Sequence, residues 1–238
     1  MKIKNIVIAA FIVLMSLASF GQTSKFHFGL HCSPNLSWIK PDVEEILYEG
    51  NGTRIGVSYG AIFEYFFTPN VGLVTGVNVI YTGGHLKYPY VPADLVGDTG
   101  TLMRCYRLQY LEIPLMIKGS TGELLGNFSF YGQFGIGTGV NLKAKADDEY
   151  QSETNPGTAA IVKNNINASK DISFFRESMI IGIGSQYKLG KSAIVQAGFN
   201  FCNGFTDILT ENTTIKPIIK EKARSNFVEL NIAFLFAF

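Results

Sequence analysis

The chain has 238 residues, of which 47% are apolar and only 16% charged, and its formal net charge is +1. This length suits one domain or one small barrel with loops, and the near-neutral charge gives no reason to expect nucleic acid as a partner. After the first twenty residues no apolar run reaches the ~18 residues that a membrane helix needs.

The N-terminus has the pattern of a secretory signal peptide. Two lysines precede an apolar run at 6–17, and small residues follow up to Gly21. We therefore expect a cleaved signal peptide over 1–21 and a mature domain over 22–238. A membrane-anchoring helix is the alternative for this segment, but its apolar run is short and a strand-like segment follows at once.

Apolar and polar residues then alternate with a period of two, which is typical of β-strands. The segments are longer than the 5 to 6 residues common in soluble sheets, and long enough for the roughly 9 to 11 residues of a tilted membrane strand. Eight segments have this pattern, at about 26–38, 55–67, 71–82, 105–118, 128–142, 174–187, 192–204 and 225–238.

The connections between these segments alternate between short and long. The short ones lie at 68–70, 119–127 and 188–191, and the long polar ones at 39–54, 83–104, 143–173 and 205–224. Short periplasmic turns, long outer loops and an even number of strands are typical of outer-membrane barrels. With the mature N-terminus in the periplasm, every long loop lies outside the cell.

The two faces of these strands distinguish a membrane barrel from a soluble, ligand-binding barrel of the lipocalin type. One face is almost wholly Phe, Ile, Val, Leu and Tyr, and the other is rich in Gly, Ser, Asn and Gln. A glycine-rich face suits a narrow barrel interior and cannot solvate an exterior. The sequence therefore predicts an all-β, eight-stranded antiparallel up-and-down transmembrane barrel in the outer membrane, with lipid around it.

Pro114 interrupts the fourth predicted strand, and a proline cannot donate to a strand ladder. We expect a local β-bulge to accommodate it.

The segment YLEIPLMIK at 110–118, which contains Pro114, resembles a strand motif of the PorT-like outer-membrane β-barrel proteins of the Bacteroidetes. The segment GFTDIL at 204–209 and the aromatic C-terminal strand extend the resemblance. It implies an eight-stranded barrel in the outer membrane. One member of that family is tied to the system that secretes proteases and gliding adhesins, so secretion is a candidate role.

Ionisable residues on the polar face are expected to project into the barrel lumen. Unpaired charges in so confined a space are costly, so we expect them to pair into a charge network that fills the lumen. The residues concerned are Glu64, Glu112, Glu229, His31, Lys118 and Arg176.

Catalytic, metal and cofactor sites are not expected. His27 and His31 would lie roughly 13 Å apart along a strand, too far to share one ion, and His85 falls in a predicted loop with no evident triad. The glycine-rich runs precede no helix, so they do not form a phosphate-binding loop. Cys32, Cys105 and Cys202 are expected to be isolated thiols.

The chain ends in alternating aromatic residues, Phe234, Phe236 and Phe238. We expect this strand to be the signal that the outer-membrane assembly machinery reads, and Phe238 to lie in the periplasmic aromatic girdle.

The function predicted from the sequence is that of a non-enzymatic barrel that binds a partner in the cell envelope, with a secretion component as a candidate. Two alternatives stay open. One is a small porin, which the narrow interior of eight strands disfavours. The other is an outer-membrane lipid-modifying enzyme.

Overall fold

The computed structural model describes residues 25–41, 49–90, 99–124, 126–154, 160–190, 192–210 and 222–238, so the expected signal peptide at 1–21 lies outside the described residues. Within this part of the chain no helix could span a membrane. Its strands are β1 (Phe26–Pro41), β2 (Glu49–Gly50), β3 (Thr53–Phe66), β4 (Val71–Tyr90), β5 (Gly100–Ser120), β6 (Phe128–Ser152), β7 (Ile161–Asn167), β8 (Phe175–Leu189), β9 (Ala193–Gly204) and β10 (Ala223–Ala237).

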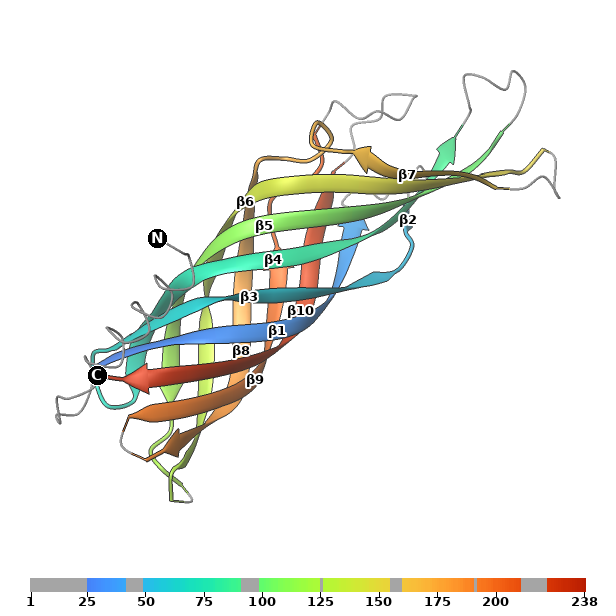
Figure 1. Cartoon of the computed structure of the whole chain (residues 1–238). Helices are drawn as coiled ribbons and strands as arrows, with labels where there is room; N and C mark the ends of the chain where they lie inside the picture. The colour runs from blue at the N-terminus through green and yellow to red at the C-terminus, as the bar shows by residue number, and fades with distance from the viewer. Residues whose placement is uncertain are drawn as a thin grey trace, which may run out of the picture.

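Eight of these strands form a closed antiparallel barrel (Figure 1). Each pairs with the next in the order β1, β3, β4, β5, β6, β8, β9, β10, and β10 pairs again with β1. The two short strands lie outside this ring, β2 on β4 and β7 on β6. The predicted eight-stranded barrel is confirmed. We call the end that holds Phe26 and Ala237 the terminal end, and the opposite end the distal end.

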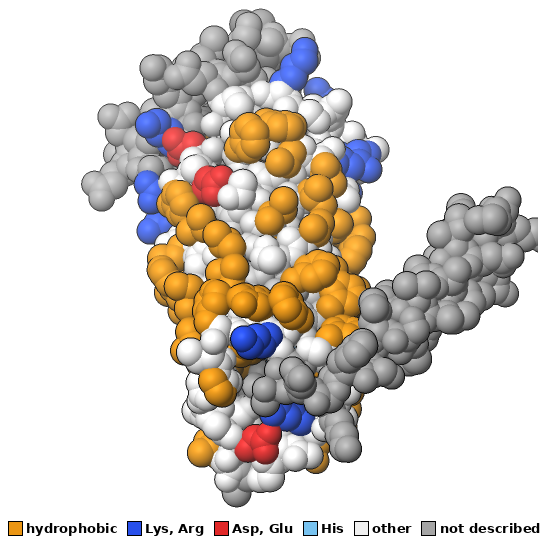
Figure 2. All heavy atoms as spheres, turned by 90° about the vertical axis from the view of Figure 1, so that its left-hand side faces the viewer, with side chains coloured by type: hydrophobic (Ala, Val, Ile, Leu, Met, Phe, Trp, Pro, Cys, Tyr) orange, Lys and Arg blue, Asp and Glu red, His pale blue; other side chains and the backbone are white. Residues whose placement is uncertain are grey.

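The barrel is apolar outside and polar inside. On β1, Leu30 is 64% exposed, whereas its neighbour His31 is 6% exposed and faces the lumen. The same alternation recurs on the other barrel strands, and hydrophobic side chains cover much of the face seen in Figure 2, with charged ones mainly above and below them. An apolar surface this large must be covered, and the surrounding membrane is the cover that a closed barrel requires.

Three neighbouring strands continue far beyond the ring at its distal end (Figure 1). The strands β4, β5 and β6 have 20, 21 and 25 residues, whereas the other barrel strands have 12 to 16. We call their continuation, residues 83–90, 100–109 and 143–152 with β2 and β7 at its edges, the distal extension.

The distal extension corrects the prediction of long polar loops at 83–104 and 143–173. Strand pairing persists there, with Lys87 opposite Met103 and Leu102 opposite Tyr150. The physical reason is a core of its own, because most of the side chains that face inward are apolar and buried, among them Leu86, Leu102 and Tyr150. Most of the outward side chains are polar.

The predicted bulge at Pro114 is wrong. The register between β5 and β6 runs unchanged through Pro114, and the β4–β5 register is the same on both sides of it. The Pro114 carbonyl accepts a hydrogen bond from the Thr75 hydroxyl at 2.8 Å. Proline is tolerated here because the neighbouring ladders hold the strand in register without its missing donor.

A register shift occurs higher on the same strand pair, between Gln109 and Tyr110. Gln109 pairs with Lys143 and Tyr110 with Asn141, which leaves Leu142 as an extra residue on β6. Below Leu142 the buried residues of β6 are odd-numbered, and above it they are even-numbered. The bulge therefore sets which side chains of β6 face the core of the distal extension.

Candidate functional site

The lumen is crossed by a first cluster near the terminal end, centred on the buried carboxylate of Glu64. Lys118 Nζ donates to it at 2.7 Å, His27 Nδ1 lies 3.0 Å away, and Gln196 Nε2 donates at 3.1 Å. Lys118 is fully buried and also lies 4.4 Å from the centre of the Tyr131 ring. This cluster links β1, β3, β5, β6 and β9 across the lumen, which suits a structural seal.

A second ion pair lies further along the lumen, between Glu112 on β5 and Arg176 on β8. Arg176 Nη1 donates to Glu112 Oε2 at 2.9 Å, and both side chains are at least 98% buried. Arg176 Nη2 also donates to the Ser225 carbonyl at 3.3 Å, and the guanidinium lies 5.1 Å from the centre of the Phe227 ring. Both charged groups are therefore shielded from water, and their polar contacts are mainly with each other and with the Ser225 carbonyl.

The other two lumen residues expected in the charge network bind neutral groups. Glu229 accepts hydrogen bonds from the Ser58 hydroxyl and from the Asn200 amide. His31 lies 2.8 Å from Asn78 Oδ1 and 3.1 Å from the hydroxyl of Ser33. The structure thus brings together Glu64 with Lys118 and Glu112 with Arg176, and it places Glu229 and His31 apart from these cations.

Little free space remains in the lumen. The central cavity, lined by His31, Glu64, Glu112 and Glu229 among others, has a volume of about 30 Å³. That is room for about one or two waters. A cavity of about 690 Å³ lies at the terminal end, where the short turns, His27 and Lys188 line it. The middle of the lumen is therefore filled, whereas the cavity at the terminal end, which we call the vestibule, is open.

Two connecting segments, residues 168–173 and 205–210, cover the distal end, and together we call them the lid. Ile172 and Leu209 form a β-bridge between them, and the Ser173 amide donates to the Ile208 carbonyl at 2.8 Å. Ile208 is fully buried, and its amide donates to the Ala223 carbonyl of β10 at 2.8 Å. The lid packs on the same apolar cluster that forms the core of the distal extension.

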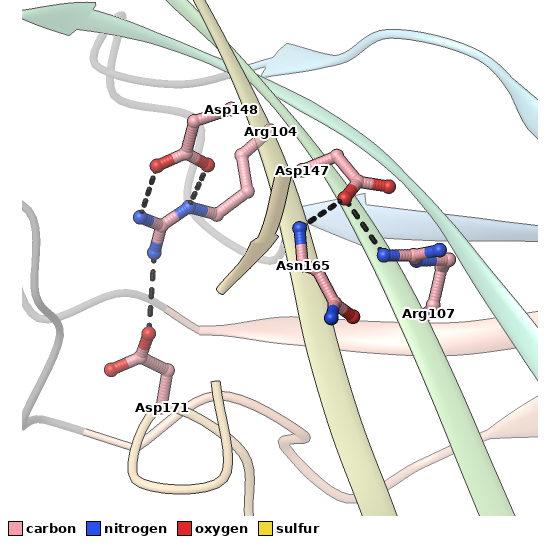
Figure 3. A network of polar contacts seen from close by, with 6 residues as sticks. All are labelled: Arg104, Arg107, Asp147, Asp148, Asn165 and Asp171. Carbon is pink, nitrogen blue, oxygen red and sulfur yellow. Dashed lines mark hydrogen bonds and ion pairs between the residues drawn. The ribbon is translucent and has the colours of Figure 1, made fainter. Parts of the chain in front are cut away.

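A buried arginine fastens the lid to the distal extension (Figure 3). Arg104 on β5 donates from Nε and Nη2 to the two oxygens of Asp148 on β6, at 2.6 and 2.7 Å. Its Nη1 donates to Asp171 of the lid at 3.2 Å. Burial alone would lower the pKa of Arg104, but the hydrogen bonds and charge of Asp148 outweigh it, so its pKa lies above the ordinary value. Arg104 therefore stays charged and holds both aspartates.

Neither Arg104 nor its partners were among the site residues predicted from the sequence, because all three fall in segments read as loops. The alternation of Leu102, Arg104 and Tyr106 was a usable signal, since these three residues share the buried face of β5.

No group of three or more His, Cys, Asp or Glu side chains in the described part of the chain could hold a metal ion. His27 and His31 contact different partners. His85, expected in a loop, lies on β4 instead, within the distal extension. All three cysteines are free thiols, Cys32 exposed, Cys105 half-buried and Cys202 buried.

The C-terminal aromatic residues lie at the terminal end. The rings of Phe234 and Phe236 meet edge to face with centroids 5.1 Å apart, and Phe234 is 42% exposed on the outer surface. The Phe238 amide donates to the Phe26 carbonyl at 2.8 Å, which ties the last residue to the first barrel strand. Phe234 is exposed and Phe236 and Phe238 are half-buried, and their proposed use as an assembly signal rests on this alternation at the end of β10.

Deleting Phe238, or making Phe238→Asp, should lower the amount of protein in the outer membrane and expose unfolded chain to periplasmic proteases. Refolding into detergent should be much less affected, because the residue adds one backbone hydrogen bond at the barrel seam. Immunoblots of membrane fractions beside refolding yields would measure both effects. Normal membrane levels of both variants would contradict an assembly signal.

A comparison with protein families agrees with this architecture. The family model of the outer membrane protein beta-barrel domain matches residues 20–210. No curated protein is similar enough to the chain to count as a match.

Three of the similar solved structures are the following. The Neisserial surface protein A is 11% identical, with 90% of this chain and 98% of that chain covered and a TM-score of 0.47. OprG from Pseudomonas aeruginosa is 15% identical, with 91% and 97% covered and a TM-score of 0.45. Ail of Yersinia pestis is 11% identical, with 89% and 99% covered and a TM-score of 0.38. Because the family model spans most of the sequence, the chain belongs to the outer membrane protein beta-barrel domain family and is a protein of the outer membrane.

Proposed function

We propose that this protein is a non-enzymatic barrel whose distal extension binds a protein partner in the cell envelope. The observation that carries the proposal is the distal extension itself, an ordered sheet with a buried core where small barrels have loops. Short turns of outer-membrane barrels face the periplasm, and the short turns lie at the terminal end, so the distal extension faces outward. A rigid platform outside the membrane suits recognition of another macromolecule.

A pore is disfavoured by the filled lumen. The two buried ion pairs and the central cavity of about 30 Å³ leave no room for a hydrated ion to pass between the vestibule and the lid. Bilayer recordings of the purified protein should therefore show no steady conductance.

Catalysis is disfavoured by the position of the most enzyme-like group of side chains. Ser33, His31 and Asn78 form a hydroxyl, imidazole and amide chain, as nucleophilic sites require. Ser33 is fully buried inside the barrel, however, and the adjacent cavity would hold about one or two waters rather than a lipid. We therefore assign these groups to packing of the lumen.

The resemblance to the PorT-like proteins makes a secretion component the more specific candidate for the partner. In the structure, residues 110–118 carry Glu112 and Lys118 of the lumen, and residues 204–209 run from the end of β9 into the lid. The resembling segments thus coincide with the parts that seal the barrel and cover its outer end.

Photo-crosslinking on living cells would test the proposal. A crosslinker at Glu149, which is exposed on the distal extension, should capture an envelope protein, and one at Lys188 on the terminal end should not capture the same protein. Deleting the gene for the barrel should then reproduce the secretion or envelope defect that follows loss of the captured protein. An unaltered envelope, or steady conductance, would overturn the proposal.

The orientation on which it depends can be checked by labelling. In a background without the three native cysteines, Glu153→Cys should react with an impermeant reagent on whole cells, because Glu153 is exposed at the end of the distal extension. Asn70→Cys, in the exposed turn between β3 and β4, should react only after the outer membrane is opened. The reversed result would place the distal extension in the periplasm.

A further inference from the structure

Three cations occupy the outward face of β5 and β6 where the distal extension leaves the membrane. Arg107 lies directly opposite Lys145, and Lys143 lies opposite Gln109 in the next row toward the barrel. Lys143 directly follows Leu142, whose side chain is 53% exposed among the lipid-facing residues. We call Arg107, Lys143 and Lys145 the boundary cations.

The boundary cations lie at the height of lipid headgroups. A strand tilted by about 45° rises roughly 5 Å along the membrane normal for every two residues. Arg107 is four residues above the half-buried, lipid-facing Leu111, and Lys143 and Lys145 follow the exposed Leu142 closely. All three therefore lie within roughly 10 Å of the edge of the hydrocarbon layer.

The local charge at these positions is only partly balanced by the protein. Asp147 accepts a hydrogen bond from Arg107 Nη2 at 2.7 Å (Figure 3). Lys145 Nζ instead donates to the neutral amide oxygen of Asn165. Lys143 and Lys145 form no ion pair with another described residue. Glu149 is on the same face, but it lies two residues further from the membrane than Asp147.

Like charges directly opposite each other on neighbouring strands repel, so the Arg107 and Lys145 pair favours a shared external anion. The guanidinium is suited to phosphate through paired N–H donors, and lysine ammonium groups add charge around it. An anion that reaches this height on the lipid-covered side of a barrel must belong to the lipid. The outer leaflet of an outer membrane is built of phosphorylated glycolipid.

We propose that the boundary cations bind the phosphates of an outer-leaflet glycolipid and so anchor β5 and β6 in that leaflet. The interface is continuous with the apolar surface that the acyl chains already cover. This binding is separate from the protein partner proposed above, because the boundary cations lie at the base of the distal extension, nearer the membrane than Glu149.

The test uses the full mature chain in nanodiscs of phosphatidylcholine, with lipid A as the glycolipid probe and native mass spectrometry as the readout. The double variant Lys143→Gln/Lys145→Gln keeps the Arg107–Asp147 pair. We expect it to retain lipid A at least about tenfold less tightly than the wild type. The matched control Lys25→Gln/Lys87→Gln removes the same charge from exposed positions at the terminal end and on the outer part of β4, and it should bind like the wild type.

Two further probes separate the source of the phosphate from charge alone. Dephosphorylated lipid A should bind the wild type as weakly as bisphosphorylated lipid A binds the double variant. Phosphatidylglycerol should bind wild type and double variant alike. The proposal is overturned if dephosphorylated lipid A binds equally well, if phosphatidylglycerol reproduces the whole effect, or if the control variant loses as much binding as the double variant. Both variants should migrate in the folded form on unheated gels, which confirms that intact barrels are being compared.

Discussion

Arg176→Ala should destabilise the barrel by roughly 3 to 5 kcal/mol, the cost of removing one partner of a buried ion pair. Glu112 is only 2% exposed and would lose the cation that lies 2.9 Å from it. The folded, fast-migrating form on unheated gels should therefore disappear at a clearly lower temperature than for the wild type. Glu112→Ala should act in the same direction, but less strongly, because Arg176 keeps the Ser225 carbonyl as an acceptor.

Two controls separate charge burial from lost packing. The double variant Glu112→Gln/Arg176→Met removes both charges and should recover much of the lost stability. Glu229→Gln should cost less than either single change, because the partners of Glu229 are a hydroxyl and an amide and no cation is left behind. Unchanged thermal behaviour of Arg176→Ala would mean that water hydrates Glu112, and would reopen the case for a passage.

Arg104→Ala should release the lid while the barrel stays folded. Asp148 would lose both hydrogen bonds from Arg104 and Asp171 would lose one, so we expect a local cost of about 3 kcal/mol. Hydrogen exchange at the Ser173 and Ile208 amides should quicken, because these amides depend on the lid being closed.

Arg107→Ala is the matched control for the released lid. Its ion pair with Asp147 has an N···O distance of 2.7 Å, as short as those between Arg104 and Asp148, but the Arg107 side chain is 36% exposed. Such a pair is worth at most about 1 kcal/mol, so lid exchange should stay near the wild-type rate. Equal protection of the lid amides in Arg104→Ala and wild type would show that apolar packing alone closes the lid.

The barrel could be predicted from the sequence because lipid imposes the same pattern on every strand that crosses the membrane. Side chains that face outward are apolar, and those that face inward are mostly polar. Above the membrane the rule reverses, since water covers the outside and the buried face must be apolar. On β5 the buried face changes from Lys118 and Glu112 to Leu108 and Tyr106 within a single continuous strand. Segments that follow the reversed rule do not match the membrane pattern, which is why the sequence predicts loops at 83–104 and 143–173.

Strand alternation also predicts that the six ionisable residues lie in the lumen, but it cannot assign their partners. Glu64 meets Lys118 across a separation of 54 residues, and which of several cations reaches it depends on the relative register of strands around the closed ring. The contact of Arg104 with Asp171 depends further on how the lid folds back, which has no period in the sequence.

The extra residue Leu142 acts on β6 much as a single inserted base acts on a reading frame. If Leu142 were paired regularly instead of bulging, the upper part of β6 would keep the phase of the lower part, which would turn Lys143 and Lys145 toward the core and Tyr150 toward water. Insertions or deletions of two residues above this point would preserve the phase and only lengthen or shorten the sheet. The distal extension is therefore free to vary in length between relatives in steps of two, and variation by one residue requires a second compensating bulge.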